Sequence, residues 1–129
     1  MAKVLVVEDV PLLSFALTDE IEAAGHPVVG PVPSTGAALM QVRVEKPTVA
    51  LIDLDLEHVH DGLELARLLK EMNIPSIVIS HAEEKLLAAA EVACGAALKP
   101  LAMEKIAAAV DQMVRAKSAV TAECNYAKV

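Results

Sequence analysis

Charged and hydroxyl side chains stand at the ends of four short apolar runs in this sequence. Glu8 and Asp9 follow the first of these runs, Asp53 ends another, Ser80 ends the next, and Lys99 ends the last. Carboxylates held close together repel unless a cation lies between them, and Mg²⁺, which takes oxygen ligands, is the usual cation beside phosphate. A lysine offers a point charge to phosphoryl oxygens. If the runs converge, the set predicts Mg²⁺-dependent phosphoryl transfer to a carboxylate.

Apolar runs alternate with helical spacings, and this alternation predicts the elements that carry these residues. The expected strands are Lys3–Val7, Val28–Val32, Val49–Leu54, Ser76–Ser80 and Ala96–Lys99. The expected helices are one from about Leu13 to Ala24, one capped by Ser34, and then Gly62–Met72, Glu83–Cys94 and Ala102–Arg115.

Strict alternation of strand and helix predicts an α/β fold with a doubly wound, five-stranded parallel sheet and five helices. The strands are apolar almost throughout, as expected for a parallel sheet that helices cover on both faces. In such sheets ligands bind beyond the carboxyl ends of the strands. The acidic residues, the serine and the lysine are therefore expected to meet at one edge of the sheet.

Composition and charge narrow the class of protein. The net charge of −7 argues against non-specific nucleic-acid binding, which needs a basic surface. No apolar stretch is long enough to cross a bilayer, and the acidic N-terminal segment does not resemble a signal peptide, so we expect a cytoplasmic location. Cys94 and Cys124 lie outside any metal-binding spacing and are expected to be reduced thiols. We expect one domain over residues 1–116, a tail over 117–129, and no output domain.

Five motifs occur in the same order as in the receiver domains of two-component response regulators, the family of the chemotaxis regulator. The motifs are VLVVED at Val4–Asp9, VALIDLDL at Val49–Leu56, DGLELARLLK at Asp61–Lys70, IPSIVIS at Ile74–Ser80 and LKP at Leu98–Pro100. The sequence closely resembles this family from about Lys3 to Arg115. The resemblance implies a flavodoxin-like sheet with strand order 2-1-3-4-5.

The resemblance also implies a role for each residue of the set. Asp53 would accept the phosphoryl group, Ser80 would be the switch hydroxyl, and Lys99 would contact the phosphoryl group before a cis Lys99–Pro100 bond. The implied Mg²⁺ ligands are Glu8, Asp9, Asp53 and the backbone carbonyl of Asp55.

Three departures from the family pattern stand out. Ala96 replaces the Tyr or Phe that often swings inward on activation, which predicts activation without an aromatic swing. His81 replaces a small residue, and its ring is expected to obstruct the water that would hydrolyse a phosphorylated Asp53. The loop after Asp53 is one residue longer than usual. It carries His58 and His60 beside Glu57 and Asp61, a set that could bind a transition metal, but a solvated polar loop is the favoured interpretation.

The predicted function is that of a stand-alone receiver, which takes a phosphoryl group from a histidine kinase or a phosphotransfer protein. It would then signal through the face formed by the helix at 83–94, the strand at 96–99 and the helix at 102–115. It would not be an enzyme beyond Mg²⁺-dependent self-phosphorylation and slow self-dephosphorylation. One alternative is a receiver-like adaptor that works without phosphorylation. The other is a small haloacid-dehalogenase-like phosphatase, suggested by Asp53-Leu54-Asp55, in which Asp55 would be the general acid–base.

Overall fold

The computed structural model describes residues 2–56, 62–117 and 127–129. Its centre is a single parallel sheet in the order β2-β1-β3-β4-β5-β6. The strands are β1 Val4–Val7, β2 Val28–Val32, β3 Val49–Asp53, β4 Ser76–Ser80, β5 Gly95–Leu98 and β6 Ala127–Lys128. The predicted order of the first five strands is confirmed, and β6 adds a short sixth strand at the edge.

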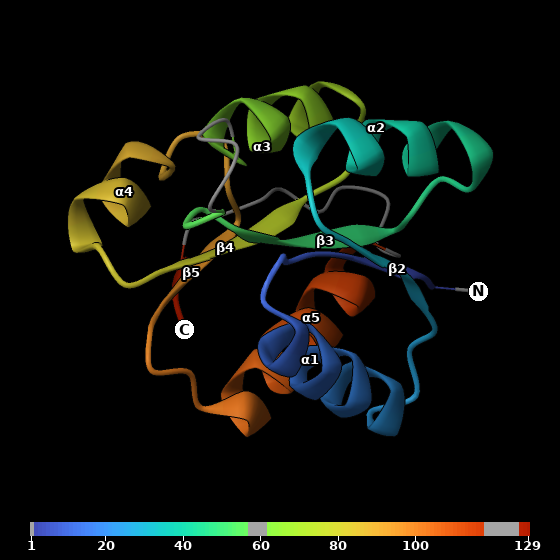
Figure 1. The fold of residues 1–129 in the computed structure, drawn as a ribbon, viewed down its shortest axis with the longest axis horizontal. Coiled ribbons are helices and arrows are strands. Elements are labelled where there is room, and N and C mark those ends of the chain that lie inside the picture. Colours follow the sequence, from blue (N-terminus) through green and yellow to red (C-terminus); the bar gives the residue numbers. More distant parts are fainter. Residues whose placement is uncertain (1, 57–61, 118–126) are drawn as a thin grey trace.

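Within the described residues, five helices cover the sheet in two layers (Figure 1). The helices are α1 Pro11–Ala23, α2 Thr35–Val44, α3 Gly62–Glu71, α4 Glu83–Ala88 and α5 Met103–Lys117. Figure 1 shows α2, α3 and α4 on one face and α1 with α5 on the other. The α/β fold class and the doubly wound arrangement are therefore confirmed.

Strand residues alternate between two apolar cores, because successive side chains of a strand point to opposite faces. Leu5 and Ile52 pack on the side of α2 and α3, whereas Val6 and Leu51 pack on the side of α1 and α5. All residues of β1, β3 and β4 are buried. This double burial explains why these strands are continuously apolar and why the first polar side chains appear at their carboxyl ends.

Local signals account for two helix starts. Pro11 occupies the first turn of α1, where its missing N–H costs no intrahelical hydrogen bond. The side chain of Ser34 accepts a hydrogen bond from the Ala37 N–H at 3.2 Å, so the predicted N-cap of α2 is confirmed.

Helix α4 is shorter than the Glu83–Cys94 helix that its alanine content predicts. Beyond Ala88 the chain continues in tight turns, with Ala90 N–H donating to the Leu87 carbonyl and Val92 N–H to the Ala89 carbonyl. Ala89 and Ala93 are buried in the core beneath these turns. The segment must also return to the sheet, where Cys94 N–H donates to the Ser76 carbonyl at 2.8 Å. Tertiary packing has therefore overridden a high local helix propensity.

The described residues at the C-terminal end add a strand to the sheet. Residues 127 and 128 pair in parallel with Gly95 and Ala96, and the Val129 N–H donates to the Ala96 carbonyl at 2.7 Å. Cys94 is disulfide-bonded, so the expectation of a reduced thiol is wrong at this position. The other cysteine of the sequence, Cys124, lies outside the described residues. No helix in the described parts of the chain is both long and apolar enough to span a membrane.

Candidate functional site at the carboxyl ends of the strands

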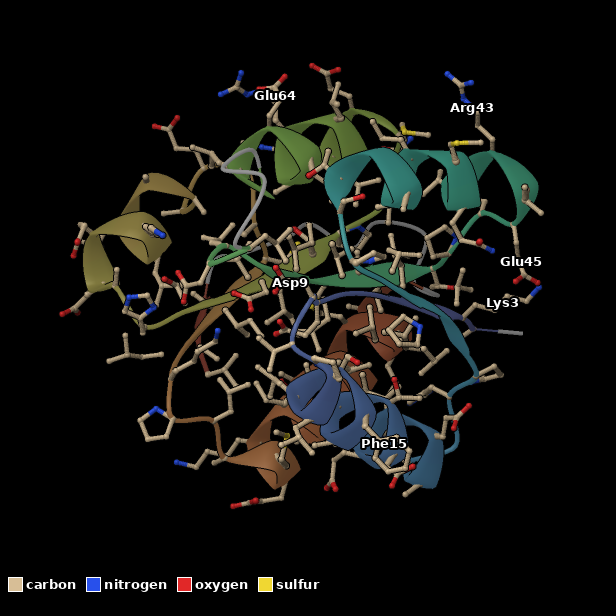
Figure 2. All side chains as sticks on the ribbon, in the orientation of Figure 1. Lys3, Asp9, Phe15, Arg43, Glu45 and Glu64 are labelled. Carbon is tan, nitrogen blue, oxygen red and sulfur yellow. The ribbon has the colours of Figure 1, made fainter. Side chains whose placement is uncertain are left out.

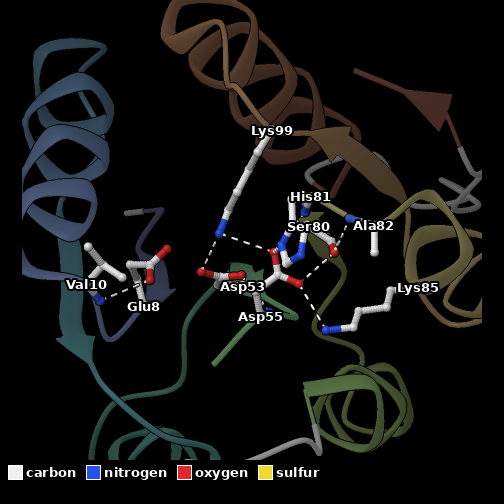
Figure 3. Close-up of polar contacts among 9 residues, drawn as sticks. All are labelled: Glu8, Val10, Asp53, Asp55, Ser80, His81, Ala82, Lys85 and Lys99. Carbon is white, nitrogen blue, oxygen red and sulfur yellow. Dashed lines mark hydrogen bonds and ion pairs between the residues drawn. The ribbon is translucent and has the colours of Figure 1, made fainter. Parts of the chain in front are cut away.

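The predicted convergence of polar side chains is present (Figure 3). Glu8 and Asp9 follow β1, Asp53 ends β3, Ser80 ends β4, and Lys99 follows β5. In Figure 2, Asp9 lies near the middle of the molecule, whereas Lys3 and Glu45 form an ion pair at the opposite end of β1. Parallel pairing aligns the strand ends, so residues far apart in the sequence meet at one edge.

Three carboxylates form the acidic cluster of this edge, defined as Glu8, Asp9 and Asp53. Each residue offers an oxygen, and these oxygens all lie within 4.8 Å of one another. Glu8 is 3% exposed and Asp53 1% exposed, so water can screen their repulsion only weakly. The cluster therefore concentrates negative charge in a place that is largely shielded from solvent.

Glu8 shows the cost of this crowding. Its Oε2 accepts a hydrogen bond from the Val10 N–H at 3.1 Å, whereas its Oε1 is buried with no hydrogen-bond partner. Burial raises the pKa of Glu8 to about 8, and the neighbouring Asp53 carboxyl adds to the rise. Without a cation, burial and the neighbouring carboxyl thus favour the protonated form of Glu8.

Asp53 is held by one donor on each carboxylate oxygen. Its Oδ1 accepts from the backbone N–H of Asp55 at 2.7 Å, and its Oδ2 lies 2.9 Å from the ammonium group of Lys99. Burial by itself would lower the pKa of Lys99, but the hydrogen bond and charge of Asp53, with the charges of Glu8 and Asp55, raise it above its usual value. Lys99 is therefore a permanent cation beside the Asp53 carboxylate.

A second carboxylate, Asp55, lies on the other side of Lys99, and its side chain is 9% exposed. Its Oδ1 accepts from the Ser80 hydroxyl at 2.7 Å and lies 3.2 Å from the ammonium group of Lys85. Its Oδ2 accepts from the His81 N–H at 2.8 Å, and lies 2.6 Å from Nδ1 of the same residue and 3.4 Å from Lys99 Nζ. Figure 3 shows these contacts converging on one side chain.

The pKa of Asp55 reflects this surplus of donors. Burial alone would raise it, but the hydrogen bonds from Ser80, from the backbone and ring of His81, and from Lys85 together hold the pKa well below its usual range. Asp55 is therefore an ionised carboxylate, in contrast to Glu8 on the other side of Asp53, whose pKa is raised.

The acidic cluster fits the donor set of a Mg²⁺ ion. Every ligand that it offers is an oxygen, which is the donor type that Mg²⁺ takes in proteins. The unpartnered Oε1 of Glu8 supplies a buried acceptor with no other use. A divalent cation would also favour the ionised form of Glu8 and offset the repulsion in the cluster. Glu8 and Asp9 are the residues that would hold such an ion beside Asp53.

The structure brings together the residues that the sequence singled out, namely Glu8, Asp9, Asp53, Ser80 and Lys99, and their roles stay predictions. The Lys99–Pro100 bond is cis as predicted. The role of the Asp55 backbone carbonyl as a metal ligand stays a prediction. His58 and His60, together with the rest of the loop weighed as a transition-metal site, lie outside the described residues.

The sequence did not single out Lys85 or the donors that surround the Asp55 side chain. Lys85 belongs to the first turns of α4, where no motif singles it out. It reaches Asp55 only because α4 begins directly above the end of β4. The only signal for Asp55 in the sequence is its position, two residues after the expected phosphoacceptor. The number of donors around its side chain is visible only in the folded structure.

Comparison with known proteins decides the family. The family described as "Response regulator receiver domain" matches residues 4–111. The chain belongs to the response regulator receiver family. It is therefore a receiver domain of the kind used in two-component signalling.

Relatives of this receiver span several kinds of protein. The receiver domain of a modulated diguanylate cyclase from Desulfovibrio desulfuricans G20 is 28% identical, with a TM-score of 0.79 over 91% of this chain and 96% of that one. A CheY-like receiver from Methanospirillum hungatei JF-1 has the same TM-score and coverage at 17% identity, which shows the shared fold. A Pseudomonas aeruginosa PAO1 protein named "Putative transcriptional regulator" is 32% identical over 79 residues, which are 61% of this chain and only 38% of that protein. The comparisons lend no support to the phosphatase or the adaptor alternative.

The structure shows the surroundings of two residues that depart from the family pattern, Ala96 and His81. Ala96 is buried in β5 between β4 and β6. The sequence has two aromatic residues of the Phe, Tyr or Trp type that could take part in an aromatic swing. Phe15 lies on the outer surface of α1 and is 67% exposed (Figure 2), and Tyr126 lies outside the described residues. The His81 side chain is 70% exposed and turned toward Asp55, so it stands at the mouth of the site.

Proposed function

We propose that this receiver accepts a phosphoryl group on Asp53, with Mg²⁺ held by Glu8 and Asp9, and that the modified domain signals by protein–protein contact. The observation that carries the proposal is the position of Asp53. Its buried carboxylate belongs to an oxygen cluster suited to a cation and also lies 2.9 Å from the ammonium group of Lys99. Few arrangements other than phosphoryl transfer use both features around one carboxylate.

In the proposed step a carboxylate oxygen of Asp53 attacks the phosphorus of a phosphohistidine or an acyl phosphate. The new bond joins that oxygen to phosphorus, and the bond from phosphorus to the leaving nitrogen or oxygen breaks with its electron pair. Lys99 is placed to hold one phosphoryl oxygen by its charge, and the Ser80 hydroxyl can donate to another. When bound, Mg²⁺ supplies positive charge that neutralises the crowded carboxylates and the incoming group.

The donor in the cell would be a histidine kinase or a phosphotransfer protein. For the downstream partner we propose the face formed by α4, β5 and α5. This face carries large apolar side chains that are exposed, with Leu87 on α4 at 59% and Leu98 on β5 at 48%. Strand β6 lies against the outer edge of β5, so a partner would dock beside this strand or displace it. We propose no catalytic turnover beyond slow self-dephosphorylation.

The decisive experiment labels the purified protein with radioactive acetyl phosphate. We expect label on the wild type with Mg²⁺ and none after EDTA treatment. Asp53→Asn should abolish labelling, because the amide that replaces the carboxylate is not a competent nucleophile. Asp19→Asn, which removes an exposed carboxylate from α1, is the matched control and should be labelled like the wild type. Equal labelling of Asp53→Asn and wild type would overturn the assignment of the site.

A further inference from the structure

The side chain of Asp55 collects an unusual number of donors for a single carboxylate. A hydroxyl, a backbone N–H, a ring nitrogen and two ammonium groups surround its two oxygens, with distances from 2.6 to 3.4 Å. Four of these contacts, from Ser80, His81 and Lys99, come from residues at or just after the ends of β4 and β5. Together they form an anion-binding arrangement, and the anion that fills it is part of the chain.

The same donors are those that a phosphoryl group on Asp53 needs. Lys99 Nζ stands between the two carboxylates, 2.9 Å from Asp53 Oδ2 and 3.4 Å from Asp55 Oδ2. The Ser80 hydroxyl, which is fully buried, is committed to Asp55 Oδ1. An added phosphoryl group brings three oxygens and about two negative charges into this space. It would meet donors that already bind Asp55, and the negatively charged Asp55 carboxylate would repel it.

We propose that Asp55 is an internal competitor of the phosphoryl group, whose carboxylate occupies the Ser80, His81 and Lys99 donors until phosphorylation displaces it. This inference rests on the proposed function of Asp53. The transfer step itself is unchanged: the oxygen of Asp53 bonds to phosphorus, and acetate leaves acetyl phosphate with the electron pair of the broken bond.

Displacement of Asp55 requires only rotation of its side chain. The backbone stays in place, because the Asp55 N–H donates to Asp53 Oδ1 at 2.7 Å and does not depend on the Asp55 carboxylate. When the carboxylate leaves, it also leaves Lys85 and the exposed ring of His81, which lie in and just before α4. Occupancy of the phosphoryl site is thereby communicated to the start of α4, which belongs to the proposed contact face.

The first test compares labelling rates at subsaturating acetyl phosphate with Mg²⁺ present. Asp55→Asn removes the charge but keeps the size of the side chain, and Asp55→Ala removes both. We expect each variant to be labelled about tenfold faster than wild type, which corresponds to about 1.4 kcal/mol of barrier. Asp55→Glu keeps the charge and should remain slow, and the surface variant Asp19→Asn should match wild type.

The second test distinguishes competition for donors from a general loosening of the site. In the wild type the Ser80 hydroxyl is engaged by Asp55, so Ser80→Ala should slow labelling only slightly. In the Asp55→Asn background the hydroxyl is released, and the same change should slow labelling several-fold more. A double-mutant cycle of the four rates measures this coupling. Binding of beryllium fluoride, which imitates the phosphoryl group without a transfer step, should be tightened by Asp55→Asn in parallel.

The outcomes separate the inference from the function on which it rests. Labelling of Asp53 in the wild type, with equal or slower rates in Asp55→Asn and Asp55→Ala and no coupling to Ser80, would overturn the competitor and leave the phosphoacceptor intact. Absence of label and of beryllium fluoride binding in every variant would overturn the proposed function and the competitor together. Loss of folding in Asp55→Ala alone leaves Asp55→Asn to decide.

Discussion

The two sides of Asp53 treat negative charge in opposite ways. On the side of β1, Glu8 is buried with an unpartnered oxygen, and its pKa is raised to about 8. On the side of β4, Asp55 is nearly as shielded, yet donors hold its pKa well below the usual range. The ammonium group of Lys99 forms ion pairs with the carboxylates of both Asp53 and Asp55.

The difference shows that burial by itself does not decide the charge of a carboxylate. The supply of donors decides it, because each hydrogen bond to the ionised form offsets part of the desolvation cost. The side of β1 lacks positive charge and therefore suits a cation. On the side of β4, the donors already surround an anion, the Asp55 carboxylate. A phosphoryl group on Asp53 would need a change on both sides, namely entry of Mg²⁺ and departure of the Asp55 carboxylate.

The first expected effect concerns the cation-deficient side. Mg²⁺ at about 100 times its dissociation constant should raise the free energy of unfolding by about 2.7 kcal/mol, since it binds only the folded chain. Asp9→Asn should remove most of this gain, whereas Asp19→Asn should keep it. Thermal or urea unfolding with and without Mg²⁺ measures both. A melting temperature that is indifferent to Mg²⁺ in the wild type would contradict the role of the acidic cluster.

The pH dependence of stability should separate the two carboxylates. Glu8 has an ordinary pKa of 4.5 and a folded value of about 8, so between these values the folded chain binds more protons than the unfolded chain. Without Mg²⁺, its contribution to the free energy of unfolding should therefore fall as pH rises from about 4.5 to 8, by at most about 1.4 kcal/mol per pH unit. Asp55 has a lowered pKa, so its stabilisation should be lost as pH falls below its ordinary 3.8.

Urea unfolding across this pH range, with Glu8→Gln and Asp55→Asn beside the wild type, tests the assignment. Glu8→Gln should flatten the fall between pH 4.5 and 8, and Asp55→Asn should weaken only the acid-side loss. If Glu8→Gln leaves the slope above pH 4.5 unchanged, the contrast between the two sides is wrong.

The smallest expected effect concerns His81, which stands at the mouth of the donor-rich side. Its ring is expected to hinder the water that must approach phosphorylated Asp53 in line, so His81→Ala should shorten the lifetime of the phosphorylated form several-fold. Asp55→Asn should change this lifetime less. Single-turnover dephosphorylation at several pH values measures both, and a lifetime that is unchanged or longer in His81→Ala would refute the steric role.

Periodicity and strand-end residues were sufficient to predict the fold and the members of the acidic cluster. Continuous apolar runs such as Val4–Val7 and Val49–Ile52 favour strands that are buried on both faces, and parallel pairing then places their ends together. These residues could be found in this way because each lies at or just after the carboxyl end of a strand: Glu8, Asp9, Asp53, Ser80 and Lys99.

Other features were decided only by tertiary structure. The length of α4 depends on how Ala89 and Ala93 pack, and β6 forms because the edge of β5 offers unpaired backbone groups to a distant segment. The state of Asp55 depends on donors from Ser80, His81 and Lys85, which lie 25 to 30 positions away in the sequence. Local patterns determine which face of an element is buried, but the charge of a carboxylate depends on every donor around it, and only the folded chain assembles those donors.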